Sequence, residues 1–137
     1  MSNIVDKIKK IDNLYHVSGC TSEQLKSAED VLRIKFPREV VEYGIEYGAI
    51  SFYGTEWTGL NVEGYLTVVD STMQERILNS LFPADCFVIE NQGIDGILTV
   101  GNERGQIFSL QYENMKLLCD SLSEYLDICC QRRKNHF

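Results

Sequence analysis

The spacing of the apolar residues changes along the chain, and this change constrains the fold more than any other feature of the sequence. Before Gly48 the apolar positions recur every three or four residues, as on one face of an amphipathic helix. Over residues 49–112 they form short β-branched and aromatic runs separated by glycine, which is typical of strands. Helical spacing returns near residue 122. Helices gathered at the two ends predict an α+β fold with N-terminal helices, a central, mostly antiparallel sheet and a closing C-terminal helix.

Capping and breaking residues set the expected bounds of the helices. Thr21-Ser22-Glu23-Gln24 and Ser121-Leu122-Ser123-Glu124 both have the pattern of a capping box. Phe36-Pro37 should end the first capped helix, because a residue before proline is driven out of the α region. Gly48 should end the next helix in a left-handed conformation. We expect helices near 3–14, 22–35, 38–47, 73–81 and 122–131, and a sheet drawn from 49–112 with one strand at 65–69.

The bulk composition is that of a globular protein with a real core. The 137 residues are 44% hydrophobic and 24% charged, and no linker, repeat or low-complexity tract divides them. We therefore expect a single domain over residues 1–137, with 132–137 as a flexible basic tail. The sequence contains no secretory leader and no run of about 20 apolar residues that would span a membrane. Both observations predict a cytoplasmic protein.

The five cysteines agree with a reducing compartment. They are odd in number and lack any CxxC spacing, so the sequence predicts no disulfide and no zinc site. Cys86 and Cys119 lie in apolar runs, where cysteine usually behaves as a small buried side chain.

Catalytic patterns are missing from the sequence. His16 and Cys20 are four residues apart, but Ser18-Gly19 interrupts any helix that would bring them together for nucleophilic catalysis. Neither a GxxxxGK[ST] phosphate loop nor a GxGxxG fingerprint occurs, and calcium loops are also missing. The glycine-rich stretches 93–96 and 101–105 lie between predicted strands, where turn formation explains them. We expect no enzyme activity, no catalytic residue, no metal and no cofactor.

The net charge of −7 is unevenly distributed. Residues 1–48 have a balance of −1, whereas residues 49–131 contain 12 acidic and only 3 basic side chains, a balance of −9. Such a field repels nucleic acid and anionic membranes, and it attracts a basic protein partner. The alternative is that these carboxylates only keep the domain in solution.

One cluster in the acidic half combines aromatic and acidic side chains. Tyr53-Gly54-Thr55-Glu56-Trp57 places two typical interface anchors beside an acid in a glycine-marked turn. Further acids close to glycines occur at Glu63 and Asp95. The sequence thus predicts a partner-binding set of five residues: Tyr53, Glu56, Trp57, Glu63 and Asp95. The alternative for Trp57 is a place in the core, because so large a side chain is usually mostly buried.

A set of motifs runs through most of the chain, beginning at Glu29 and including Phe36-Pro37 and Tyr47-Gly48. It continues in Phe87-Val88-Ile89, Gly93, Asp95-Gly96, Gly105-Gln106-Ile107-Phe108 and the closing motif 121–126. In these motifs the chain resembles the SUKH superfamily, with Leu122 where phenylalanine is more usual, and the bacterial members of that superfamily are largely immunity proteins for polymorphic and contact-dependent toxins. The resemblance covers about residues 22–130 and implies an α+β fold with a central sheet and no catalytic residues.

Two classes of function follow from this resemblance. The first is an immunity protein that neutralises a cognate bacterial toxin by direct contact, with a basic nuclease as the toxin that matches the acidic half. The second is a regulatory or scaffold module of the same fold, because eukaryotic relatives resemble scaffolding or cell-wall regulatory factors. A small enzyme is a third and weaker alternative.

Overall fold

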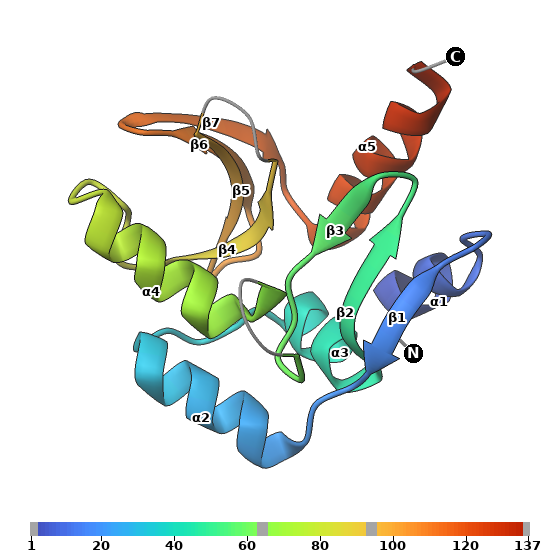
Figure 1. Cartoon of the computed structure of the whole chain (residues 1–137), viewed down its shortest axis with the longest axis horizontal. Coiled ribbons are helices and arrows are strands. Elements are labelled where there is room, and N and C mark those ends of the chain that lie inside the picture. Colours follow the sequence, from blue (N-terminus) through green and yellow to red (C-terminus); the bar gives the residue numbers. More distant parts are fainter. Residues whose placement is uncertain (1–2, 63–65, 93–95, 136–137) are drawn as a thin grey trace.

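The structure, a computed structural model, describes residues 3–62, 66–92 and 96–135. Its helices are α1 Asn3–Lys9, α2 Ser22–Leu32, α3 Arg38–Glu46, α4 Val68–Leu78 and α5 Leu122–Asn135. Its strands are β1 Tyr15–Ser18, β2 Tyr47–Phe52, β3 Thr55–Trp57, β4 Cys86–Asn91, β5 Ile97–Asn102, β6 Ile107–Gln111 and β7 Asn114–Cys119. The expected α+β fold, with helices before the sheet and a closing helix after it, is confirmed (Figure 1).

Two antiparallel sheets replace the one sheet that the sequence predicted. The first pairs β1, β2 and β3 in that order, and the second is a meander of β4, β5, β6 and β7. The first predicted helix is shorter than expected, since α1 ends at Lys9 and β1 follows it. The predicted strand at 65–69 is also wrong, because α4 already begins at Val68.

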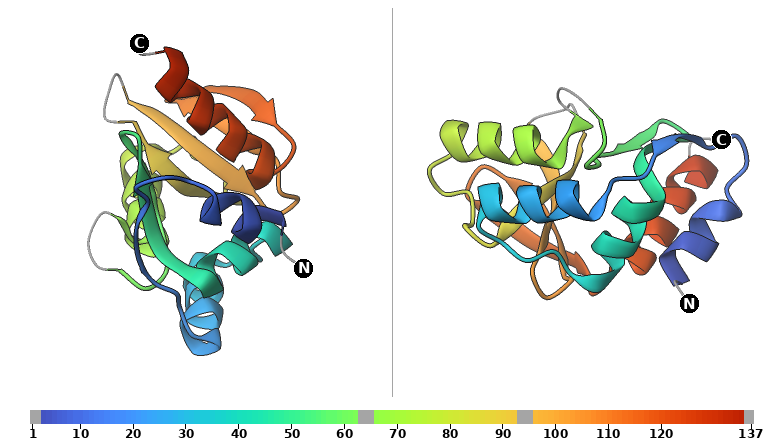
Figure 2. Two further views of the ribbon diagram at one scale, coloured as in Figure 1. Left: turned by 90° about the vertical axis from the view of Figure 1, so that its right-hand side faces the viewer. Right: turned by 90° about the horizontal axis from the view of Figure 1, so that it is seen from below.

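The four-stranded sheet is apolar on both faces. Side chains of a strand alternate between faces, so Phe87 and Ile89 join the main core, whereas Cys86 and Val88 face a second, smaller cluster. The members of that second cluster are Phe82, Cys86, Val88, Leu98, Val100 and Leu110. Figure 1 shows the sheet curving, with α4 across its concave side, and Figure 2 shows α2 alongside α4 and α5 against the opposite face.

The edge of this sheet formed by β4 is closed by neighbouring elements. The backbone N–H of Val88 donates to the Thr72 hydroxyl of α4 over 3.0 Å, and the Val88 carbonyl accepts from the Thr58 hydroxyl over 2.8 Å. The backbone N–H of Thr58 donates to the Ile89 carbonyl over 2.8 Å. An unpaired strand edge can pair with other chains, and these contacts remove that hazard at β4.

The C-terminal segment differs from the expected flexible tail at 132–137. Helix α5 continues to Asn135, and the Arg132 guanidinium forms two hydrogen bonds with the Glu90 carboxylate, at 3.1 and 3.0 Å. Arg132 was therefore wrongly placed in a tail, because an ion pair with a residue 42 positions away leaves no local pattern in the sequence.

Candidate functional site

Trp57, the predicted apolar anchor, is a core residue. Its side chain is 0% exposed and stacks on the Tyr125 ring at a centroid distance of 5.8 Å. The Tyr43 ring packs edge-on against it at 5.5 Å. Strand alternation accounts for this placement, because Thr55 and Trp57 point inward while Glu56 points outward. The prediction that Trp57 offers its ring to a partner is therefore wrong, and the core alternative is correct.

The structure brings together two of the remaining predicted binding residues. Tyr53 and Glu56 both lie on the hairpin that joins β2 to β3. Tyr53 is half-buried, its φ is 49°, and its ring packs edge-on against Phe52 at 5.9 Å. Glu56 is exposed and lies opposite Ser51. Glu63 and Asp95 lie outside the described residues, so a shared site for all four stays a prediction.

A buried polar network joins α5 to the four-stranded sheet. The Tyr125 hydroxyl donates to the Glu90 carboxylate and is 2.8 Å from the Thr99 hydroxyl. Arg132 closes the network by donating to Glu90 and to the Tyr125 oxygen, the latter over 3.0 Å. Burial raises the pKa of the Tyr125 hydroxyl, and nearby Cys129 and Glu90 raise it further. Glu90, Thr99 and Tyr125 are buried and hydrogen-bonded within the network, and half-buried Arg132 covers its outer side, so the network fastens α5 to β4 and β5.

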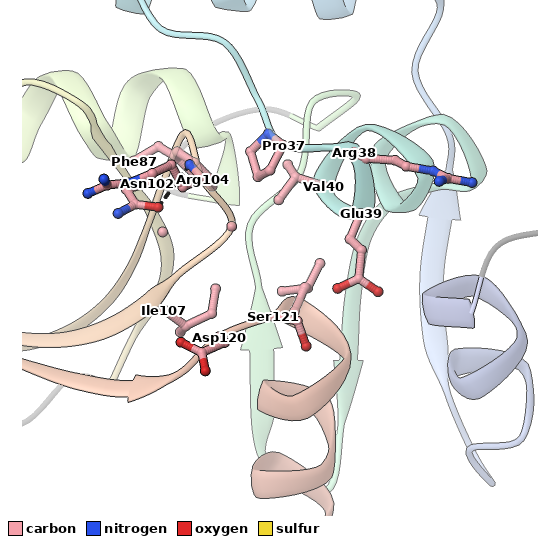
Figure 3. Close-up of a pocket in the computed structure, with 13 residues that line it drawn as sticks. Pro37, Arg38, Glu39, Val40, Phe87, Asn102, Arg104, Ile107, Asp120 and Ser121 are labelled. Atoms are coloured by element: carbon pink, nitrogen blue, oxygen red, sulfur yellow. Dashed lines mark hydrogen bonds between the residues drawn. The ribbon is translucent and has the colours of Figure 1, made fainter.

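A cavity of about 220 Å³ lies where the first turns of α3 and α5 meet the β5–β6 turn (Figure 3). The start of a helix attracts anions, and two such starts converge here. Glu39 already fills that role, because its carboxylate accepts from the Ser123 backbone N–H over 3.1 Å and from the Ser123 hydroxyl. In Figure 3 the Glu39 carboxylate lies beside the start of α5. The cavity is also smaller than the roughly 300 Å³ at which small-molecule sites usually begin.

Four of the five thiols, those of Cys20, Cys86, Cys119 and Cys129, lack the environment of a nucleophile. Burial raises the pKa of Cys129 to about 12 and that of Cys86 to about 12. Burial also raises the pKa of Cys20, the cysteine of the His16–Cys20 alternative, and the His16 ring instead packs edge-on against Tyr47 at 5.2 Å. A reactive cysteine needs its pKa lowered, so these shifts oppose nucleophilic catalysis. Within the described ranges, no group of three histidine, cysteine or acidic side chains is placed to hold a metal ion.

A surface that the sequence analysis missed exposes large apolar side chains. At the end of α4 and just after it, Ile77, Leu78 and Leu81 are 81%, 69% and 63% exposed. On β7, Met115 and Leu117 are 40% and 49% exposed. The Asn79 amide, which follows α4, donates to the Tyr112 carbonyl in the β6–β7 turn over 2.9 Å, so the two groups belong to one region. We call these five residues the α4–β7 surface.

A signal for this surface was present in the sequence. Met115 and Leu117 alternate with Asn114 and Lys116, which is the pattern of a strand with one apolar face. The expected sheet ended at residue 112, so this strand was omitted. Nothing in its pattern indicates that the apolar face stays uncovered, since that depends on where α4 and α5 pack.

Exposed acidic side chains occur throughout the strand-rich half, and two of them flank β7 in the sequence. In the strand-rich half, the exposed acids among the described residues are Glu56, Asp70, Asp85, Glu103, Glu113, Asp120, Glu124 and Asp127. Glu113 precedes β7 directly and Asp120 follows it directly. Apolar area with a polar, charged border is the usual anatomy of a protein–protein interface.

Comparison with known proteins supplies one match. The model of the family SUKH_5, described as SMI1-KNR4 cell-wall, matches residues 1–131. A search of curated proteins found none that matches the chain. Separately, none of the helices in the described residues has the length and apolar character needed to cross a membrane.

Proposed function

The chain belongs to the SMI1-KNR4 (SUKH) family, and from this premise we propose that it is an immunity protein that neutralises a cognate bacterial toxin by direct contact. Proteins of this family are often immunity proteins in toxin systems. The observation that supports the proposal most strongly is the α4–β7 surface, with Ile77, Leu78 and Leu81 each more than 60% exposed. Such residues on a small protein usually mark an interface that a partner covers.

The charge distribution favours a basic toxin. Eight described acids of the strand-rich half are exposed, and Glu90, which is buried, is neutralised by Arg132. A toxin that cleaves nucleic acid needs a cationic surface to bind phosphates, and that surface is complementary to this half of the chain. Opposite charges steer two proteins together and speed their association, which matters when a free toxin is lethal. In this proposal the contact takes place in the cytosol, where five thiols stay reduced.

Binding, rather than catalysis, is the proposed mode of action. Cys86 and Cys129 have raised pKa values, the cavity beside Glu39 is small, and the network around Glu90 is closed. Neutralisation would then follow from covering the toxin's own site, which requires only a tight complex.

A regulatory or scaffold protein is the second candidate. The family is described as a cell-wall family, which favours a protein that assembles or regulates cell-wall factors. The same exposed surface would serve such a module, because a scaffold also acts by binding protein. The two candidates differ in the effect of losing the chain: the partner of an immunity protein would then be toxic, whereas the partner of a scaffold would be wrongly assembled or regulated.

A protection experiment separates the two candidates. A toxin gene encoded beside the gene of this chain is expressed from an inducible promoter, with and without the chain. The proposal expects growth arrest by the toxin alone, full growth with the chain, and a complex of the two purified proteins. Arrest that the chain does not relieve would contradict the immunity role. Altered cell shape after deletion of the chain, with no toxicity from any neighbouring gene, would favour the scaffold.

A further inference from the structure

Strand β7 is an edge of the four-stranded sheet, and its outer side has no strand beside it. The strand order is β4-β5-β6-β7, so β7 pairs only with β6 (Figure 1). Among residues 3–62, 66–92 and 96–135, no backbone group outside β6 forms a hydrogen bond with the backbone of Asn114–Leu118. This contrasts with the opposite edge, where Thr58 and Thr72 form hydrogen bonds with the outward C=O and N–H of Val88 in β4.

The register shows which backbone groups point outward. The two-residue turn of Tyr112 and Glu113 makes Gln111 and Asn114 a hydrogen-bonded pair. Hydrogen-bonded and non-hydrogen-bonded pairs alternate along an antiparallel ladder, so Ser109 and Lys116 are bonded. Met115 and Leu117 are in the pairs between, and their N–H and C=O groups therefore point away from β6. The outer edge thus presents two donors and two acceptors at the spacing that another strand requires.

The side chains of the same two residues add an apolar contact. Met115 lies opposite Leu110, and Leu117 lies opposite Phe108. Leu110 is a member of the second apolar cluster, and Phe108 packs against it. Met115 and Leu117 continue this apolar face to the edge, where they are 40% and 49% exposed. A strand added beside β7 would cover both side chains while pairing with their backbone.

The charges at the two ends of β7 select the kind of strand. Glu113 and Asp120 are exposed acids placed directly before and directly after β7. In a symmetric antiparallel pair of two copies of this chain, Glu113 of one copy would lie near Asp120 of the other, and like charges would repel at both ends. A strand with basic ends would meet an opposite charge at each end. The edge therefore favours a basic partner over a second copy of the chain.

We propose that β7 is a strand-addition site, which takes an extended segment of a partner protein with an apolar middle and a lysine or arginine at each end. The proposal rests on the proposed function, since it names the part of the chain that holds the toxin. Backbone hydrogen bonds at Met115 and Leu117 supply the register, and Glu113 and Asp120 select the basic ends.

Hydrogen exchange of single amides tests the open edge without any substitution. In the free protein the amides of Met115 and Leu117 should exchange much faster than those of Asn114 and Lys116, which bond to β6. The probe is a capped peptide in which threonine and valine alternate between an arginine at each end. Its binding should slow exchange at Met115 and Leu117 by at least about tenfold. Equal protection of all four amides in the free protein would show that the edge is already covered, and would overturn the proposal.

The charge requirement is tested with a second peptide. It has the same middle and a glutamate at each end, and it should bind at least about tenfold more weakly than the arginine peptide. The double variant Glu113→Gln/Asp120→Asn should reduce this difference, whereas Glu23→Gln/Asp30→Asn on α2 should leave it unchanged. The proposal would be contradicted if both peptides bind equally well. It would also be contradicted if the peptide changes amide exchange only outside β7, or if β7 pairs with a second copy of the chain as the protein concentration rises.

A matched pair of variants links the site to the toxin. Leu117→Ala and Leu117→Pro both remove the leucine side chain, but only proline removes the outward N–H. Proline should weaken the toxin complex at least about tenfold more than alanine. Slow hydrogen exchange of the Lys116 amide in both variants would show that β7 still pairs with β6. If both variants bind like the wild type, strand addition is wrong and the immunity function stands. If the wild type itself neither binds nor protects, the proposed function fails.

Discussion

Arg132→Met tests the buried ion pair that fastens the end of α5. The change keeps most of the aliphatic side chain but removes the guanidinium, which leaves the Glu90 carboxylate without its partner. The Glu90 side chain is 7% exposed and the Arg132 side chain 29%. Breaking a fully buried pair costs about 3–5 kcal/mol, and the partial exposure of Arg132 reduces our expectation to about 2–3 kcal/mol. Deleting residues 132–137, the segment expected to be a flexible tail, should cost at least as much.

Urea unfolding at neutral pH measures this cost. With a slope of about 2 kcal/mol per molar, the midpoint of Arg132→Met should lie about 1–1.5 M below that of the wild type. Arg38→Met is the matched control, because the Arg38–Glu42 pair is an exposed helix pair and should contribute about 0.3–0.5 kcal/mol. Adding Glu90→Gln to Arg132→Met should recover part of the loss, since the unpaired charge is then removed. A midpoint for Arg132→Met equal to that of Arg38→Met would refute the role assigned to the network.

Three further predictions concern the core, a helix cap and the thiols. Trp57→Ala should lower the free energy of unfolding by about 3–5 kcal/mol in urea, because the side chain is fully buried; a stable variant that merely binds more weakly would restore Trp57 as an interface anchor. Thr21→Ala should cost about 1 kcal/mol in the same assay, and no loss would mean that the α2 cap is not formed in solution. At pH 8 an alkylating reagent should modify half-buried Cys130 well before Cys129, because burial raises the pKa of Cys129 to about 12 and leaves few thiolates. Mass spectrometry of digested protein checks this order, and faster modification of Cys129 would contradict it.

Helix N-caps and the β5–β6 turn were predicted correctly from the sequence, because each depends on only a few neighbouring residues. The capping box of α2 is present in full: the Gln24 backbone N–H donates to the Thr21 hydroxyl, and the Gln24 side chain accepts from the Thr21 backbone N–H. Of the second expected capping box, the structure shows the hydrogen bond in which the Glu124 backbone N–H donates to the Ser121 hydroxyl over 3.1 Å. The turn between β5 and β6 contains Gly105 at a φ of 89°, as a glycine-marked hairpin requires.

Features that depend on distant residues were missed. Gly48 was expected to end a helix, but it lies in β2, where a Cβ atom would come within 2.4 Å of the Ser18 carbonyl oxygen. A Cβ atom at Gly59 would in turn come within 1.2 Å of the Gly48 carbonyl oxygen. Both glycines are thus required by packing between segments, which no local pattern reveals. The exposed edge at β7 and the burial of Trp57 are likewise consequences of how the sheets and helices pack.

The most direct test of the proposed immunity role is to identify a toxin encoded beside the gene of this chain and to measure its association rate with the purified chain. Raising the salt from about 0.01 M to about 0.15 M shortens the screening length from about 30 Å to about 8 Å. If the acidic half captures a basic toxin, the association rate should fall at least about tenfold while the dissociation rate changes little. An association rate that salt leaves unchanged would contradict electrostatic capture, and a toxin that forms no complex at either salt concentration would contradict the immunity function itself.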